Sequence, residues 1–107
     1  NKSLPIINQV IYFFISTVQA YRIAKSFKPD IIHGNIGYPG ALWSWMLSKL
    51  CNIRFVITEH TLITNNFRSY FHKLLTLFGL RKASIVITVS NFSAALIQKH
   101  TGIKAHV

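Results

Sequence analysis

The chain has 107 residues, half of them hydrophobic, and its twelve Lys and Arg side chains oppose only two acidic ones, Asp30 and Glu59. A chain of this length forms at most one ordinary domain, and its hydrophobic content is ample for a core. The single cysteine, Cys51, excludes an intramolecular disulfide and is predicted to be a buried structural residue.

Apolar residues at helical spacing predict a first helix. It is expected to begin at Pro5, which suits a first turn, and to end near Phe27, because Pro29 disfavours helix at the residue before it. Its apolar stripe consists of Ile7, Val10, Ile11, Phe14, Val18 and Tyr21. The most apolar run, Val10–Ile15, has six residues, whereas a membrane span needs roughly twenty. This helix is therefore expected to be buried within the protein.

Three short runs of β-branched residues predict strands, and each run ends abruptly in polar residues. The runs cover Ile31–His33, Arg54–Thr58 and Ile85–Val89, and a further strand is expected to begin within Lys104–Val107. Runs that are apolar on both faces are typical of parallel strands covered by helices. Since each gap between strands has room for one helix, the sequence predicts an α/β fold with a Rossmann-like, doubly wound parallel sheet and right-handed crossovers.

Two of the intervening helices have clear end signals. One is expected from about Gly40 to Leu50, with Asn52 as its stop. The other is expected over Asn91–His100, with Ser90 as its cap and Gly102 at its end. The buried side of the first of these is predicted to hold Leu42, Trp45, Met46 and Leu50.

The remaining helix is predicted to begin after Asn65–Asn66, either of which can cap it, and to end near Leu80. Its expected apolar stripe consists of Phe67, Tyr70, Phe71, Leu74, Leu77 and Phe78. Its expected polar face consists of Arg68, His72, Thr76 and Gly79, with Lys73 beside it.

The polar residues that follow the strands are the first candidates for function, because open α/β sheets bind ligands at the carboxyl ends of their strands. These residues are His33–Asn35, Glu59–Thr61 and Ser90–Asn91. His60, which opens a loop directly after a strand, is the leading candidate. His33 has a packing role as an alternative, and Ser90 has a capping role. Asp30 precedes its strand, which predicts a place at the opposite edge.

Several kinds of chemistry lack the residues that they need. One carboxyl group at the functional edge cannot run a two-carboxylate glycosidase mechanism. No His or Cys pair has zinc-ligand spacing, and no GxSxG elbow is present, so neither a metal nor a serine nucleophile is expected. The turn GNIGYPG, over Gly34–Gly40, has glycines that permit positive φ and close approach to a ligand. It lacks GxGxxG and the phosphate-loop lysine, but as a loop that leads into a helix amino terminus it can still receive an anion or sugar hydroxyls.

Two segments together resemble the amino-terminal half of a glycosyltransferase family 4 enzyme. They are KPDIIHGNIGYPGALWSWMLSKLCNIRFVITEH, over Lys28–His60, and ASIVITVSNFSAALIQKHTGI, over Ala83–Ile103. The resemblance implies the GT-B architecture, with two Rossmann-like domains facing a cleft. It also implies that residues 1–107 are part of the amino-terminal, acceptor-side domain, without its first strand and without the carboxyl-terminal domain. Such a piece is expected to be inactive by itself.

The resemblance further implies a retaining transfer of a sugar from a nucleotide-sugar donor to a hydroxyl of a lipid-linked or saccharide acceptor, without a metal or other cofactor. His60 matches the histidine that contacts the donor sugar, and Glu59 is expected to orient it or an acceptor hydroxyl; both are predicted to be catalytic. The predicted substrate-binding residues are His33, Asn35, Gly37, Tyr38, Thr61, Arg68, Ser90 and Asn91. Many relatives have Gly and an acid after this histidine, where the chain has Thr61 and Leu62.

The basic surplus has three candidate partners: nucleic acid, an anionic membrane and a phosphorylated substrate. Nucleic acid is not expected, because the basic residues are spread along the chain and the aromatic residues have core spacing. The resemblance favours a cytoplasmic enzyme of cell-envelope or exopolysaccharide synthesis, peripheral to the inner face of a membrane. The predicted contacts with that surface are Arg68, Lys73, Arg81 and Lys82. A sugar-nucleotide epimerase of the same architecture and a non-catalytic binding module are the alternatives.

Overall fold

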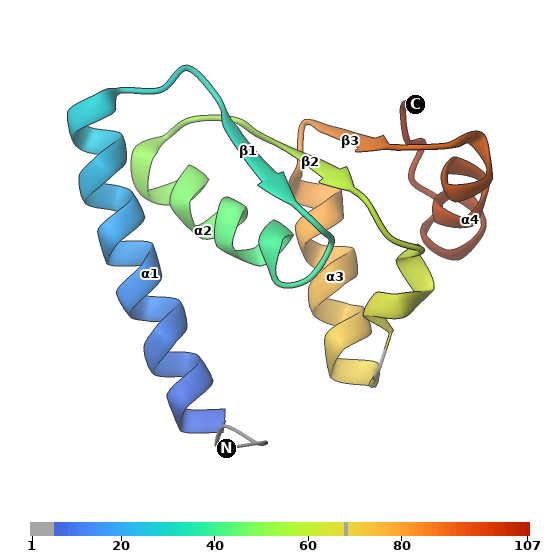
Figure 1. Cartoon of the computed structure of the whole chain (residues 1–107), viewed down its shortest axis with the longest axis horizontal. Coiled ribbons are helices and arrows are strands. Elements are labelled where there is room, and N and C mark those ends of the chain that lie inside the picture. Colours follow the sequence, from blue (N-terminus) through green and yellow to red (C-terminus); the bar gives the residue numbers. More distant parts are fainter. Residues whose placement is uncertain (1–5, 68) are drawn as a thin grey trace.

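Helices and strands alternate along almost the whole chain (Figure 1). The computed structural model describes residues 6–67 and 69–107, apart from the side chain of residue 66. The elements are α1 (Ile6–Phe27), β1 (Ile32–Asn35), α2 (Gly40–Cys51), β2 (Phe55–Glu59), the 3-10 helix η1 (Ile63–Asn66), α3 (Tyr70–Lys82), β3 (Ile85–Thr88) and α4 (Asn91–Thr101).

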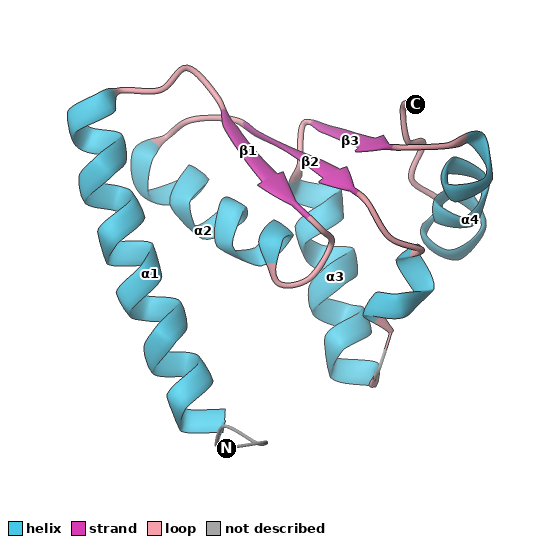
Figure 2. Ribbon diagram, in the orientation of Figure 1, coloured by secondary structure: helices cyan, strands magenta, loops and turns pink. Residues whose placement is uncertain are grey.

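The strands form a parallel sheet in the order β1-β2-β3 (Figure 2). Gly34 pairs with Ile57, which pairs in turn with Val86, and His106 adds a parallel bridge to Ile87 on β3. The crossovers are α2 and α3, which confirms the predicted α/β class with a parallel sheet that alternates with helices. The second helical layer of a doubly wound sheet stays a prediction.

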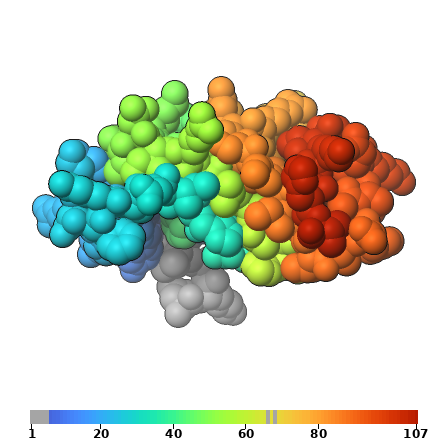
Figure 3. All heavy atoms as spheres, turned by 90° about the horizontal axis from the view of Figure 1, so that it is seen from above, coloured from blue at the N-terminus to red at the C-terminus, as the bar shows by residue number. Residues whose placement is uncertain are grey.

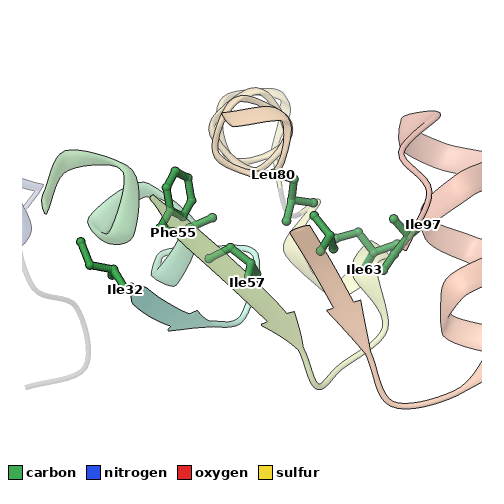
Figure 4. Packing of buried hydrophobic residues seen from close by; sticks show 8 residues of the cluster. Ile32, Phe55, Ile57, Ile63, Leu80 and Ile97 are labelled. Atoms are coloured by element: carbon green, nitrogen blue, oxygen red, sulfur yellow. The ribbon is translucent and has the colours of Figure 1, made fainter. Parts of the chain in front are cut away.

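The core lies where one face of the sheet meets the helices. Its buried side chains are Ile32, Ala41, Phe55, Ile57, Ile63, Leu80, Val86 and Ile97. Ile63 extends this core beyond the sheet, because η1 folds back and brings it against Leu80 and Ile97 (Figure 4). The loop after β2 is thereby anchored by a fully buried side chain at one end.

The first helix is not buried as predicted. Its apolar side chains are largely exposed, including Phe14 at 56%, whereas its buried residues are Thr17 and Ala24. The reason is that α1 packs beside α2 at one end of the molecule, with α4 at the other end (Figure 3). None of the described helices is long and apolar enough to cross a membrane.

The prediction for α3 is wrong in both its start and its orientation. The cap is Ser69, whose Oγ accepts from the His72 N–H at 3.2 Å, and Asn65 lies in η1 instead. Thr76 and Gly79, which were assigned to a polar face, are buried. Most of the predicted apolar stripe is exposed, namely Tyr70, Phe71, Leu74 and Phe78, whereas Phe67 and Leu77 are half-buried.

Small residues explain this inversion. A Cβ on Gly79 would lie 2.6 Å from the Cβ of Ala41, so the absence of a side chain lets α3 approach α2 closely. On α2, Ala41 and Ser44 are likewise the buried residues, while the predicted Leu42, Trp45 and Met46 are half-buried and Leu50 is exposed. Cys51, predicted to be buried, is half-buried and free. Asn52 ends α2 in the left-handed conformation, as predicted.

Candidate functional site

The turn between β1 and α2 carries most of the predicted binding residues. β1 continues to Asn35, two residues beyond the predicted end, so His33 lies inside the strand rather than at its carboxyl end. Gly34 of β1 lies so close to α2 that a Cβ there would overlap the Oγ of Ser44, so this position of the strand requires glycine. Asp30 precedes β1 and therefore lies at the opposite edge of the parallel sheet, as predicted.

The sequence predicts positive φ at the glycines of this turn. The residue with positive φ is instead Ile36, with φ of 72°. A β-branched residue in this region is strained, and such strain persists only where surrounding contacts enforce it. The Ile36 N–H donates to the Thr58 carbonyl oxygen at 2.9 Å, which attaches the turn to β2. Gly40 serves close approach instead, since a Cβ there would overlap the Asn35 carbonyl oxygen.

Glu59 connects two loops from inside the protein. Its side chain is 0% exposed. Its Oε2 accepts from the Gly37 N–H at 2.7 Å, while its Oε1 accepts from the Thr61 N–H at 3.1 Å and from the Thr61 hydroxyl at 2.9 Å. A buried carboxyl group that accepts several hydrogen bonds holds its donors firmly. Glu59 therefore fixes the β1–α2 turn and the loop after β2 against each other.

His60 lies on the exposed side of this junction. Its Nε2 is 3.0 Å from Oδ1 of Asn35, at the end of the neighbouring strand. Because an amide oxygen only accepts, the ring donates from Nε2, and in a neutral ring Nδ1 is left as an acceptor. Asn35 and His60 thus form an exposed hydrogen-bonding pair at the carboxyl edge of the sheet, next to Thr61.

The other predicted residues are not brought into this pair. The His33 Nε2 lies 2.6 Å from Oγ1 of Thr58, a contact that the sequence does not predict because Thr58 has the pattern of an ordinary strand residue. Ser90 caps α4 by accepting from the Ser93 N–H at 3.1 Å, as one alternative predicted, and Asn91 begins that helix. Arg68 lies outside the described residues.

Tyr38 faces a different neighbour. Its ring meets that of His72 edge to face, with the centroids 4.8 Å apart. His72 was expected to be a plain surface residue, but it is half-buried, and its Nδ1 lies 2.7 Å from the Oγ of Ser69. The Tyr38 ring therefore packs the β1–α2 turn against the start of α3.

The described part of the chain contains no group of three or more His, Cys, Asp or Glu side chains that could hold a metal ion. The exposed groups at the carboxyl edge include three that form hydrogen bonds: the Asn35 amide, the His60 imidazole and the Thr61 hydroxyl. Such groups suit the hydroxyls of a sugar, which donate and accept hydrogen bonds without charge.

Residues 2–107 match the family model described as Glycosyltransferase Family 4. The chain belongs to glycosyltransferase family 4. A comparison with curated proteins found no match. The matched range includes α1, which extends the likeness beyond the segments that carried the resemblance in the sequence. Membership implies a nucleotide-sugar donor and an acceptor for this glycosyltransferase in general terms.

Proposed function

We propose that this glycosyltransferase retains the configuration of the sugar that it moves to an acceptor hydroxyl, and that His60 contacts the sugar. The observation that carries this proposal is the Asn35–His60 pair at the carboxyl edge, 3.0 Å apart, beside a turn that Glu59 anchors from within. Family membership favours this function over an epimerase or a non-catalytic module. The acceptor proposed is lipid-linked or a saccharide, as in cell-envelope or exopolysaccharide synthesis.

In the proposed mechanism, the acceptor attacks on the face that the nucleoside diphosphate leaves. His60 orients the sugar by hydrogen bonding, with Nε2 held by Asn35 and Nδ1 free to accept a sugar hydroxyl. Glu59 acts as a positioning residue, because the oxygens of its carboxyl group hold Gly37 and Thr61. Preorganised groups of this kind lower the barrier because they need no rearrangement as charge develops on the leaving group.

We further propose that residues 1–107 form part of one Rossmann-like acceptor-side domain. The support is the sheet topology together with the absence of a GxGxxG turn or a phosphate-loop lysine in the β1–α2 turn. The groups that hold the donor nucleotide would then belong to another domain, as in the GT-B architecture.

His60→Ala in the full-length enzyme is expected to lower turnover about tenfold or more, because one lost orienting hydrogen bond in the transition state costs about 1.4 kcal/mol. His106→Ala is the matched control, since its side chain is exposed and only its backbone pairs with β3. A donor-consumption assay checks both. Equal rates for the two variants would contradict a role for His60 in transfer.

Asn35→Ala tests whether His60 works through its partner. If the pair acts as a unit, Asn35→Ala should also slow transfer, and the double variant should be hardly slower than His60→Ala alone. Fully additive losses in the same assay would mean that Asn35 acts independently of His60.

The outer face of α3 supports docking on an anionic membrane at the cytoplasmic side. It combines exposed aromatic residues, Phe71 among them at 64%, with the exposed Arg81 and Lys82, while Lys73 is half-buried beside this face. The Nζ of Lys82 lies 5.6 Å from the centre of the Phe78 ring. Apolar rings beside cations are typical of surfaces that lie in a lipid headgroup region.

Changing Lys73 and Arg81 to Gln should weaken binding to anionic vesicles by about 2 kcal/mol at low salt, since each charge contributes about 1 kcal/mol near such a surface. Sedimentation with vesicles of increasing anionic lipid content measures this, and added salt should reduce the binding. The same charge change at Lys99 and Lys104, which are exposed on other segments, is the control. Vesicle binding that does not depend on lipid charge would contradict docking through α3. So would an equal loss of vesicle affinity in the two variants.

A further inference from the structure

A pocket of about 370 Å³ lies at the amino-terminal edge of the sheet, opposite the candidate functional site. Its walls come from the last turns of α2, the connection into β2 with the first residue of that strand, and the turn between α3 and β3. Hydrogen bonds join these walls: the Ser48 hydroxyl donates to the Ile53 carbonyl oxygen, and the Ser84 N–H donates to that of Phe55 at 2.8 Å. Hydrogen bonds to backbone carbonyl groups thus hold the walls of the pocket together.

Three cationic side chains line this pocket, namely Lys49, Arg54 and Lys82, and no acidic residue does. The two acidic residues of the chain lie elsewhere: Glu59 is at the carboxyl edge, and Asp30 is not among the lining residues. Like charges that share one pocket repel each other, so an anion that contacts them together is favoured there.

Helix ends account for only part of this charge. Lys49 and Lys82 lie in the last turns of α2 and α3, where the helix dipole favours a cation. The helix dipole does not explain Arg54, because this residue immediately precedes β2 and is not at a helix end. Its presence brings a third cation, with a planar set of donors, to the same cavity.

Uncharged donors complete the lining. Ser84 offers a hydroxyl and Asn52 an amide, both on exposed residues. Trp45 also lines the pocket, and its buried indole N–H finds no acceptor among the described residues. A phosphoryl group, with its negative charge and several acceptor oxygens, matches such a mixture of cations and neutral donors.

We propose that this pocket binds a phosphoryl group, carried either by a soluble phosphorylated molecule or by a lipid headgroup. Its volume is in the range of small-ligand sites and exceeds the needs of one phosphate ion. This site is separate from the sugar-transfer site, since it lies at the other edge of the sheet and shares none of its residues.

Titration of the full-length protein with inorganic pyrophosphate tests the proposal. Calorimetry at about 0.15 M salt should give saturable binding. In NMR spectra, the indole N–H signal of Trp45 should shift, while that of Trp43 should not. Lys49→Gln with Arg54→Gln should weaken binding about tenfold or more. The matched control is Lys99→Gln with Lys104→Gln, which removes the same charge outside the pocket and should leave the affinity nearly unchanged.

Vesicles with phosphatidic acid distinguish the two sources of the phosphoryl group. Binding that depends on Lys49 and Arg54 supports the site with either probe, and the probe that binds identifies the source. Equal losses in the pocket and control variants would reduce the effect to net charge and overturn the proposal. The absence of saturable binding with both probes would also overturn the proposal. This outcome is independent of the activity of His60→Ala and of vesicle binding through Arg81.

Discussion

Glu59→Ala is expected to lower the free energy of unfolding by about 3 kcal/mol or more, because the buried Gly37 N–H and the Thr61 N–H lose their acceptor and a cavity is left behind. The donors concerned are the Gly37 and Thr61 N–H groups, which lie 2.7 and 3.1 Å from the carboxyl oxygens. Urea denaturation followed by circular dichroism measures the change. Glu59→Gln, which keeps the shape but replaces one acceptor by a donor, should lose about 1–3 kcal/mol.

Asp30→Ala is the matched control for this experiment, since it removes the other carboxyl group of the chain. Asp30 is exposed at the amino edge, so its loss should change stability by no more than about 0.5 kcal/mol. If Glu59→Ala were as stable as Asp30→Ala, the buried hydrogen bonds of Glu59 would not hold the two loops together.

Gly40→Ala is expected to destabilise the protein by about 2 kcal/mol or more, because a new methyl group meets backbone that cannot move aside cheaply. The added Cβ would overlap the Asn35 carbonyl oxygen and also lie 2.8 Å from the carbon of that carbonyl group. Displacing Asn35 also displaces the partner of His60, so transfer should slow along with the loss of stability. Denaturation and the donor-consumption assay together check both effects.

Gly102→Ala provides the comparison for Gly40→Ala. A Cβ on Gly102 would meet nothing within 4 Å, but its φ of 74° is one that alanine adopts reluctantly. The cost there should be about 1 kcal/mol, with no change in the rate of transfer per folded molecule. Normal stability and turnover in Gly40→Ala would show that the turn can rearrange and does not fix Asn35.

Local sequence signals were sufficient for most of the fold. Pro29, Asn52 and Gly102 end their helices by restricting or requiring particular backbone conformations, and those helix ends lie where they were predicted. The strands are recognisable from their β-branched runs, although the described structure buries only alternate residues of β1 and β3. The end of β1 was misjudged, since Gly34 and Asn35 have the local preferences of a turn and are held in the strand by pairing with Ile57 and Thr58.

The candidate site was predictable in its position but not in its connections. Parallel strands bring their carboxyl ends to one edge, which suffices to place Asn35 beside His60. That Glu59 turns inward to Gly37, while His60 turns outward to Asn35, depends on the loops that follow β1 and β2, which only the tertiary structure brings together. His33 lies inside β1, because the strand continues to Asn35, and its partner Thr58 is contributed by the neighbouring strand.

By itself, the sequence determined the order of the elements, the parallel α/β class and the edge at which polar residues gather, because these follow from backbone preferences and the period of apolar residues. Tertiary structure alone decided which helical faces are covered. Gly79 and Ala41 let two helices meet along small residues, and this contact turns Phe71 and Leu74 outward although their spacing predicted a buried stripe. The physical reason is that periodicity reveals an apolar face, whereas burial depends on which surfaces fit closely together.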